Sequence, residues 1–257
     1  MIKNSLKNKY IQRSIVVTLL VLLWEALYHL QVFPVQLFPS TSQILKALFV
    51  DLLDGKLFVQ IGHSLYLIFT GLVIGFIIAV ILCYISYFSK LISVLIDTLI
   101  AILDPLPGVA ILPMIILWIG IGEKAILFIM LHSIIWPMVI SIQTGMKNID
   151  RVYIESAKMN AIRNWQLFWY ILLPLSLPQI LAGIKIGWSR SWRALISSEM
   201  IFGAIGAFGG IGWYLFEKRT FMNTPGMFSG LLVIIMISIF VEDIIFVKLD
   251  QYIIRSI

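Results

Sequence analysis

Long apolar runs separated by short polar stretches dominate the chain. A membrane helix needs about 20 mostly apolar residues, and the runs that reach this length are 14–33, 64–87, 91–120, 125–143, 174–201 and 227–246. The third run is too long for one simple crossing. Because proline removes a helical hydrogen bond, we expect Pro105 and Pro107 to break or kink it. The pattern predicts an all-α polytopic membrane protein with about six transmembrane helices.

The composition agrees with this class. Of the 257 residues, 60% are hydrophobic and 12% are charged, whereas about half of a typical soluble domain is apolar. The formal net charge is +6, but the basic residues are scattered between apolar runs, so nucleic-acid binding is not expected. The single cysteine, Cys83, excludes an internal disulfide, and with three dispersed histidines it does not make a metal site. With no internal repeat or linker in view, we expect one transmembrane domain over residues 1–257.

The distribution of basic residues predicts the orientation. A basic start is followed by an apolar run of about 20 residues without a small-residue cleavage site, which favours a retained span over a signal peptide. Six spans place both termini on one side of the membrane. With that side inside, the inner segments hold Lys3, Lys7, Lys9, Arg13, Lys90, Lys147, Arg151, Lys158, Arg163, Lys248 and Arg255. The outer segments hold Lys46, Lys56, Lys124, Lys218 and Arg219. This excess of 11 over 5 predicts cytoplasmic termini.

The segment from about 144 to 173 is polar at its start and aromatic at its end. Asp150 can cap a helix that begins at Arg151, and this helix is too short and too polar to span a bilayer. A second short helix follows, and its Trp165 and Trp169 are typical of the lipid headgroup region. The first helix could lie on the membrane surface or dock into a groove of a soluble partner.

This segment resembles a cytoplasmic motif in the permease subunits of bacterial ABC importers. The motif reads E-A-A, three residues, G, nine residues, I-x-L-P. The chain keeps the spacing with Glu155, Ser156, Ala157, Ala161, Ile171, Leu173 and Pro174. In the family, the segment forms a coupling helix that sits in a cleft of the ATP-hydrolysing subunit. The resemblance therefore implies that these residues couple the chain to an ATPase.

The departure at Ala161 affects the turn that ends this helix. The family has glycine there, and only glycine adopts left-handed backbone angles at little cost. Alanine would lose about 1 kcal/mol or more in that conformation. We therefore expect either a different turn or unusual angles at Asn160 or Asn164. The second departure, Ser156 for alanine, is small.

Four further stretches resemble the nitrate, taurine, sulfonate and bicarbonate branch of these permeases: TLLVLLWEALYHL, LFPSTSQILKAL, LDPLPGVAILPMIILWIGIGE and WRALISSEMIF. Gly108 stands where the branch more often has a second proline. The resemblance implies a type I importer fold in the bacterial cytoplasmic membrane. It also implies a homodimer of this subunit, two ATPase subunits and an extracytoplasmic substrate-binding protein.

No G-x-x-x-x-G-K-[ST] sequence occurs in the chain, so it does not supply a phosphate-binding loop. We expect ATP and Mg to bind to the partner ATPase, with no cofactor in this chain and no enzymatic activity of its own. The glycine-rich stretch 203–212 lacks the required lysine and is expected to form an external turn.

Charged residues inside membrane spans are costly and often functional. Arg190 and Arg193 are three residues apart and share a helix face. Facing a water-filled path, they would attract an anion such as a sulfonate, carboxylate or phosphate. Alternatively, they pair with Asp97 and Asp104 of the third run, and both arrangements could hold in different transport states. Glu199 is a further path candidate, although we expect it to be hydrogen-bonded near the outer mouth.

We therefore expect the translocating subunit of an ATP-driven importer for a small solute, with an anion of the sulfonate, taurine or nitrate type favoured by the basic pair. A polytopic membrane enzyme would gather acids, bases or metal ligands near one face, and no dense cluster of this kind occurs. An ion-coupled carrier would show inverted repeats, for which the broken third run is the only hint. Glu25 and His29 are expected to make a contact between helices rather than a proton relay.

Overall fold

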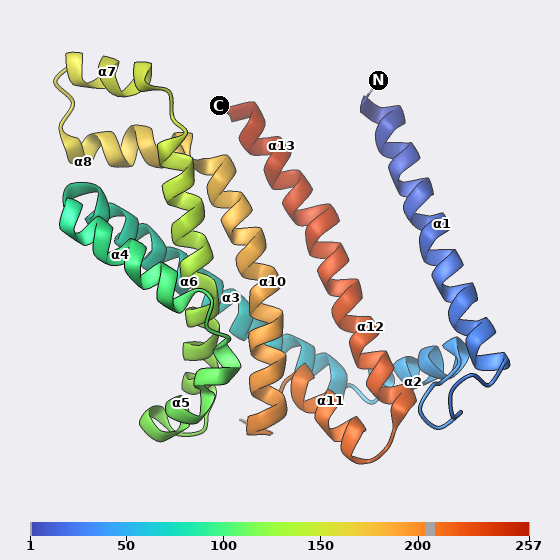
Figure 1. The fold of residues 1–257 in the computed structure, drawn as a ribbon. Coiled ribbons are helices and arrows are strands. Elements are labelled where there is room, and N and C mark those ends of the chain that lie inside the picture. The colour runs from blue at the N-terminus through green and yellow to red at the C-terminus, as the bar shows by residue number, and fades with distance from the viewer. Residues whose placement is uncertain (1, 204–208, 257) are drawn as a thin grey trace. The chain divides into compact units, whose positions relative to one another are not determined.

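The computed structural model describes residues 2–203 and 209–256, and every element in these ranges is helical (Figure 1). The first half holds α1 (Ile2–His29), α2 (Thr41–Leu53), α3 (Lys56–Phe88), α4 (Lys90–Leu103), a 3-10 turn (Gly108–Ile111), α5 (Leu112–Ile119) and α6 (Glu123–Lys147). The second half holds α7 (Arg151–Met159), α8 (Asn164–Leu167), a π turn (Phe168–Leu172), α9 (Leu173–Leu175), α10 (Leu177–Phe202), α11 (Ile211–Thr220), α12 (Thr224–Phe240), a second π turn (Val241–Phe246) and α13 (Val247–Ser256). Of the glycine-rich stretch 203–212, residues 204–208 lie outside the described ranges.

The predicted number of membrane spans agrees with these helices. Four segments are long and apolar enough to cross a membrane: Ile11–His29, Lys56–Phe88, Glu123–Lys147 and Thr224–Ile253. Two pairs meet the same criterion together, although Lys90–Leu103 and Gly108–Ile119 are bent by 89°, and Asn164–Leu175 and Leu177–Phe202 by 68°. If each bent pair is one span, the total is six. The predicted all-α polytopic class is confirmed.

The bend in the third apolar run lies at the prolines, as predicted. Helix α4 ends at Leu103, and the 3-10 turn begins at Gly108 after Pro105 and Pro107. A Cβ atom at Gly108 would lie 2.9 Å from the Ile129 side chain and 3.0 Å from Ser133 Oγ on α6. The missing side chain therefore lets this turn approach α6 closely.

The chain forms two compact units, and their boundaries fall near the start of α3, within α11 and within α12. Unit 1 holds Met1–Phe58 and Tyr214–Ile234, and unit 2 holds Val59–Trp213 and Ile235–Ile257. Each unit has its own polar and apolar contacts.

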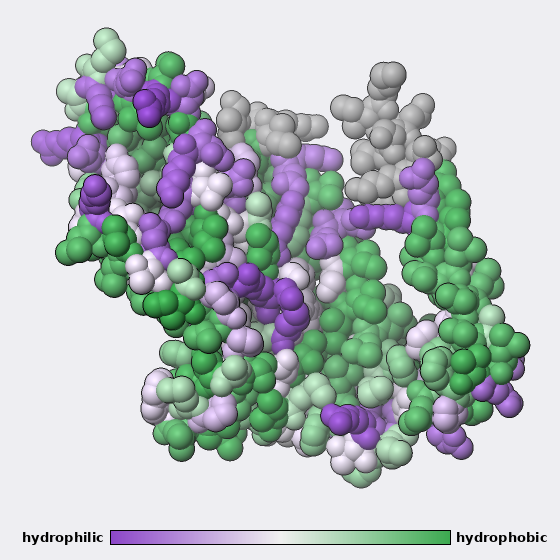
Figure 2. All heavy atoms as spheres, viewed as in Figure 1, coloured by the Kyte–Doolittle hydropathy of each residue, from purple (hydrophilic) through white to green (hydrophobic). Residues whose placement is uncertain are grey.

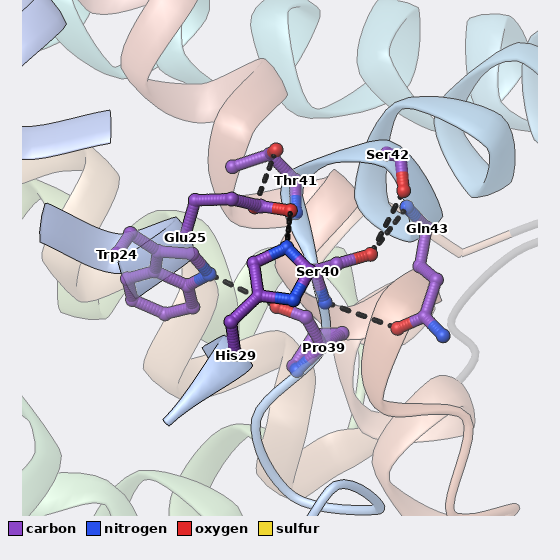
Figure 3. A network of polar contacts seen from close by, with 8 residues as sticks. All are labelled: Trp24, Glu25, His29, Pro39, Ser40, Thr41, Ser42 and Gln43. Carbon is purple, nitrogen blue, oxygen red and sulfur yellow. Dashed lines mark hydrogen bonds and ion pairs between the residues drawn. The ribbon is translucent and has the colours of Figure 1, made fainter. Parts of the chain in front are cut away.

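In unit 1, a polar network connects the end of α1 to the start of α2 (Figure 3). The carboxylate of Glu25 accepts hydrogen bonds from the Thr41 backbone N–H at 3.0 Å and from Thr41 Oγ1 at 2.7 Å. The Trp24 indole donates to the Pro39 carbonyl at 2.9 Å. A carboxylate is favourable at a helix N-terminus. Glu25 thus makes the expected contact between helices, with His29 at 3.5 Å on the same helix.

A second network in unit 1 connects α2, α11 and α12. Asp51 accepts hydrogen bonds from the Tyr214 hydroxyl at 2.6 Å and from Lys218 Nζ at 2.7 Å. The Tyr214 hydroxyl also lies 2.9 Å from Ser229 Oγ. Burial, followed by the neighbouring Asp51 carboxylate, raises the pKa of the Tyr214 phenol. The phenol therefore stays neutral and remains a hydrogen-bond donor.

In unit 2, α6 and α10 pack closely because glycines lie at their interface. A Cβ atom on Gly183 would lie 2.7 Å from Ser141 Cβ, and one on Gly187 would lie 2.8 Å from Met138 Cε. Small residues four apart let two membrane helices approach each other closely. This contact fixes the position of the polar side chains of α10 against α6.

Candidate functional site

The first part of the candidate site is the short helix α7. Asp150 caps it as predicted, because its side chain accepts a hydrogen bond from the Val152 N–H at 3.1 Å. Figure 1 shows α7 and α8 together at the end of unit 2 where α6 ends and α10 begins. The cap satisfies one of the free N–H groups at the helix start. Helix α7 is therefore a defined element between two spans.

Helix α7 ends in a Schellman motif. The Ile162 N–H donates to the Ala157 carbonyl at 3.1 Å, and the Ala161 N–H donates to the Lys158 carbonyl at 3.0 Å. Ala161 has a φ of 52°, the left-handed conformation that glycine usually supplies at this position, whereas Asn160 has an ordinary φ of −85°. The two expected alternatives, a different turn or unusual angles at a neighbouring asparagine, are both wrong. Ala161 itself adopts the glycine conformation.

The inner face of α7 packs against the helices that follow it. Ala157 is only 3% exposed and forms a buried cluster with Leu167 and Leu172, onto which Ile162 and Ile171 pack. From the sequence motif, we expected Ala157 to be one of the residues that couple the chain to an ATPase. Its methyl group instead lies inside the loop, where it holds α7 in place. Sequence reasoning missed Leu167 and Leu172, whose only signal was their place in the apolar stretch after Trp165.

The outer face of α7 is exposed and mixed in character. Glu155 and Ser156 are exposed, and so are the apolar side chains of Val152 and Met159, the last at 88%. Tyr153 is exposed too, although it lies four residues before Ala157 and so on the same side of the helix. Figure 2 shows hydrophilic side chains over this end of unit 2 and hydrophobic ones over α5 and the far end of α6. Exposed apolar side chains in a polar setting are typical of a surface that binds a partner.

The remaining motif residues lie in the connection from α8 to α10. Ile171 falls in the π turn, and Leu173 and Pro174 begin α9. Proline lacks the N–H that would continue the regular pattern, and single π turns are frequent at functional sites. Phe168 of this turn packs edge-on against Tyr84 of α3, with ring centroids 5.0 Å apart. The connection is thus packed against a span.

The second part of the candidate site is a cavity in unit 2, with a volume of about 350 Å³. It lies between the turn after α4, the middle of α6 and the second half of α10. Figure 2 shows a group of hydrophilic side chains over the middle of α10. The cavity is lined by Asp104, Pro105, Leu106, Pro107, Gly108, Val109, His132, Ser133, Arg190, Arg193, Ala194 and Ser197.

The two arginines of α10 both line this cavity but differ in their partners. Arg190 Nη1 lies 2.6 Å from Asp104 Oδ1 and forms an ion pair with it. Arg193 forms no ion pair with a carboxylate among the residues the structure describes. Asp97 lies outside the cavity lining and accepts a hydrogen bond from Gln143 at 3.3 Å. The expected pairing with an acid therefore holds for Arg190 alone, and its partner is Asp104.

Three polar residues that line the cavity were not predicted as site residues from the sequence. His132 and Ser133 come from α6, and Ser197 lies four residues after Arg193 on α10. Both ring nitrogens of His132 are buried and have no hydrogen-bond partner within residues 2–203 and 209–256. The spacing of Ser197 from Arg193 was a usable signal, because residues four apart share a helix face.

Glu199 does not line the cavity. It is 2% exposed and accepts hydrogen bonds from the Gly212 N–H at 2.7 Å and from Ser64 Oγ at 3.3 Å. Ser64 Oγ in turn accepts a hydrogen bond from the Ile211 N–H at 2.9 Å. The carboxylate thus connects α10 to α3 and to the start of α11.

Comparison with known families decides the class of protein. The model of the family described as "Binding-protein-dependent transport system inner membrane component" matches residues 71–255. This range includes α7 and the whole cavity, and it exceeds half of the chain. The chain belongs to this family.

Relatives support the same assignment and the predicted branch. The taurine transport system permease protein TauC of Escherichia coli (strain K12) is 28% identical over 232 residues, which cover 88% of this chain and 83% of the relative. The nitrate import permease protein NrtB of Synechocystis sp. is 25% identical over 251 residues, which cover 95% of this chain and 87% of the relative. As a member of this permease family, the chain is a multi-pass inner-membrane transport component.

Proposed function

We propose that this permease is the translocating subunit of an ATP-driven importer, and that α7 couples it to a separate ATPase. The observation that carries the proposal is the two-sided packing of α7. Its inner face is fixed by Ala157, which packs with Leu167 and Leu172. Val152 and Met159, on the opposite face of the helix, are exposed. A short helix that is held firmly from within can transmit a displacement from a partner bound to its outer face.

The assembly we propose contains two ATPase subunits, which bind ATP and Mg, and a homodimer of this subunit. An extracytoplasmic binding protein delivers the solute. Both termini lie in the cytoplasm, and residues 1–257 act as one transmembrane permease domain. The solute is a small anion of the sulfonate, taurine or nitrate type. The similarity to taurine and nitrate transport permeases and the two arginines in the cavity support this choice.

The proposed mechanism follows from the connection between α7 and α10. ATP binding draws the two ATPase subunits together, and each subunit displaces one α7. The π turn and α9, which contains Pro174, pass this displacement to α10, the helix that carries Arg190 and Arg193. In this mechanism, the pathway is open to the inside without ATP and open to the outside with ATP bound. Coupling therefore requires a stiff connection between Ala161 and α10.

Photo-cross-linking from two exposed methionines tests the partner assignment. Met159 on α7 is 88% exposed and Met222 after α11 is 76% exposed, so both positions accept a photoreactive amino acid without disturbing a core. We expect Met159 to cross-link to an ATPase subunit in membranes and Met222 to give no such product. A product from Met222, or none from Met159, would contradict the proposal.

An insertion tests the stiff connection. Two glycines between Tyr170 and Ile171 should leave part of the ATPase activity but uncouple it from uptake, because the insertion loosens the link to α10. The same insertion after Gly55, in the turn between α2 and α3, should leave the ratio of uptake to ATP hydrolysis unchanged. An unchanged ratio in the first variant would refute the lever mechanism.

A further inference from the structure

We propose that the cavity between the turn after α4, α6 and α10 is a binding site selective for small monovalent anions. Arg193 binds the anionic group, and the Asp104–Arg190 ion pair sets the net charge of the site. This inference rests on the proposed function only in placing the site on the path of the transported solute. The binding step itself can be measured without transport.

The selectivity for one negative charge follows from the charges that line the cavity. Arg190 and Arg193 supply two positive charges and Asp104 supplies one negative charge, which leaves one positive charge. His132 is the other ionisable residue in the lining, and its unpartnered ring nitrogens fit a neutral imidazole, because a buried unpaired charge is strongly unfavourable. A single negative charge therefore neutralises the site, and a second one would face the Asp104 carboxylate.

The different partners of the two arginines assign their roles. The guanidinium of Arg190 is held by Asp104 at 2.6 Å, so part of its donor capacity is already used. Arg193 has no carboxylate partner among the described residues. Its Nε donates to the Ser189 carbonyl at 3.4 Å, which leaves its two terminal nitrogens to bind two oxygens of a sulfonate, carboxylate or nitrate at once. Arg193 is therefore the binding residue, and Arg190 and Asp104 are positioning residues.

The rest of the lining favours a small solute with a neutral polar part. A neutral histidine offers one donor and one acceptor, and each serine hydroxyl can donate and accept. The ring nitrogens of His132 are buried, so the serines supply these groups around the arginines. The Ser133 hydroxyl donates to the Ile129 carbonyl at 3.1 Å and can still accept, and the Ser197 hydroxyl lines the cavity as well. The volume of about 350 Å³ is near the lower end of the range of about 300–1,000 Å³ for ligand sites. The site thus fits a small organic or inorganic monoanion.

Calorimetric titration of the full-length permease in lipid nanodiscs tests the proposal, with methanesulfonate as the monovalent probe and sulfate as the divalent probe. The wild type should bind methanesulfonate in preference to sulfate. Arg193→Gln should weaken methanesulfonate binding about 10- to 100-fold, as expected for the loss of hydrogen bonds to a charged group. Lys185→Gln is the matched control, since Lys185 lies on the same helix and pairs with Asp250 outside the cavity lining. It should bind both probes like the wild type.

The ion pair gives the sharper test because one variant should gain binding. Asp104→Asn raises the net charge of the site to two positive charges, so we expect sulfate to bind about tenfold more tightly. Arg190→Gln lowers the net charge to zero and should abolish methanesulfonate binding. The double variant returns to one positive charge and should recover much of it. A misfolded protein cannot produce the gain or the recovery.

Several results would overturn the proposal. These are no measurable binding of methanesulfonate by the wild type at millimolar concentration, wild-type affinity in Arg193→Gln, or no gain for sulfate in Asp104→Asn. The cross-linking from Met159 is an independent readout. If cross-linking fails while the charge series behaves as expected, the proposed coupling of α7 to an ATPase is wrong and the anion site is retained. If cross-linking succeeds while the charge series fails, the anion site is wrong and the coupling of α7 to an ATPase is retained.

Discussion

Replacing Ala161 by glycine is expected to stabilise the turn that ends α7. Ala161 has a φ of 52°, which brings the Cβ of an L-residue too close to the neighbouring carbonyl oxygen. Its side chain is exposed, so removing the methyl group leaves no cavity. Both hydrogen bonds of the Schellman motif are made by backbone atoms and persist in the variant.

Two opposing terms set the size of the effect. The left-handed conformation disfavours alanine by about 1–2 kcal/mol relative to glycine. Glycine, in turn, gives the unfolded chain more freedom, which lowers stability by about 0.4–1 kcal/mol. The central values of the two ranges, about 1.5 and about 0.7 kcal/mol, leave a net gain of about 0.8 kcal/mol, so we expect about 0.5–1 kcal/mol. At tenfold per 1.4 kcal/mol, this corresponds to about a two- to fivefold lower population of the opened loop.

Limited proteolysis measures this population. Trypsin cleaves after Lys158 and Arg163, which flank the turn, and cleavage follows the opening equilibrium when the loop closes faster than it is cut. We expect Ala161→Gly to be cut about two- to fivefold more slowly than the wild type. Ser156→Gly is the matched control, because Ser156 is exposed within the regular part of α7. Glycine there weakens the helix and should speed cleavage.

One outcome would refute the reasoning. If Ala161→Gly is cut as fast as the wild type or faster, while Ser156→Gly is cut faster, then the assay reports loop opening and Ala161 is not strained. A slower cut in both variants would show instead that the cleavage rate does not depend on the stability of α7.

Further predictions concern the packing and polar contacts of the two units. Gly183→Val should lower the thermal unfolding temperature in detergent, because the new Cβ would lie 2.7 Å from Ser141 Cβ; an unchanged temperature would contradict the packing of α6 on α10. Glu199→Ala should destabilise the protein by about 1–3 kcal/mol, since the buried Gly212 N–H loses its acceptor, and Glu199→Gln should recover part of this loss in a denaturant titration. The raised pKa of Tyr214 means that its contribution is complete below its ordinary pKa of about 10 and is lost as the pH rises further. Above pH 10 the wild type should therefore lose more stability than Tyr214→Phe, and equal losses would show that the phenol is not responsible.

The sequence alone determined the features that depend on local chemistry. The length of each apolar run predicted about six spans, because the bilayer thickness sets how many residues a helix needs; four of them are single helices and the other two are bent pairs. The prolines after Asp104 located the break in the third run, and Asp150 located the start of α7. A missing N–H and a capping carboxylate act within a few residues, so their effects can be predicted from neighbours in the chain.

Only the tertiary structure decided which polar groups meet. From the sequence, Asp97 and Asp104 were equally possible partners for the arginines. In the structure, Asp104 pairs with Arg190, while Asp97 contacts Gln143. The 89° bend and the close packing of α6 on α10 decide this, because an ion pair depends on the distance through space and not on the separation along the chain. For the same reason, nothing in the sequence indicated that His132 of α6 lines the same cavity as the arginines of α10.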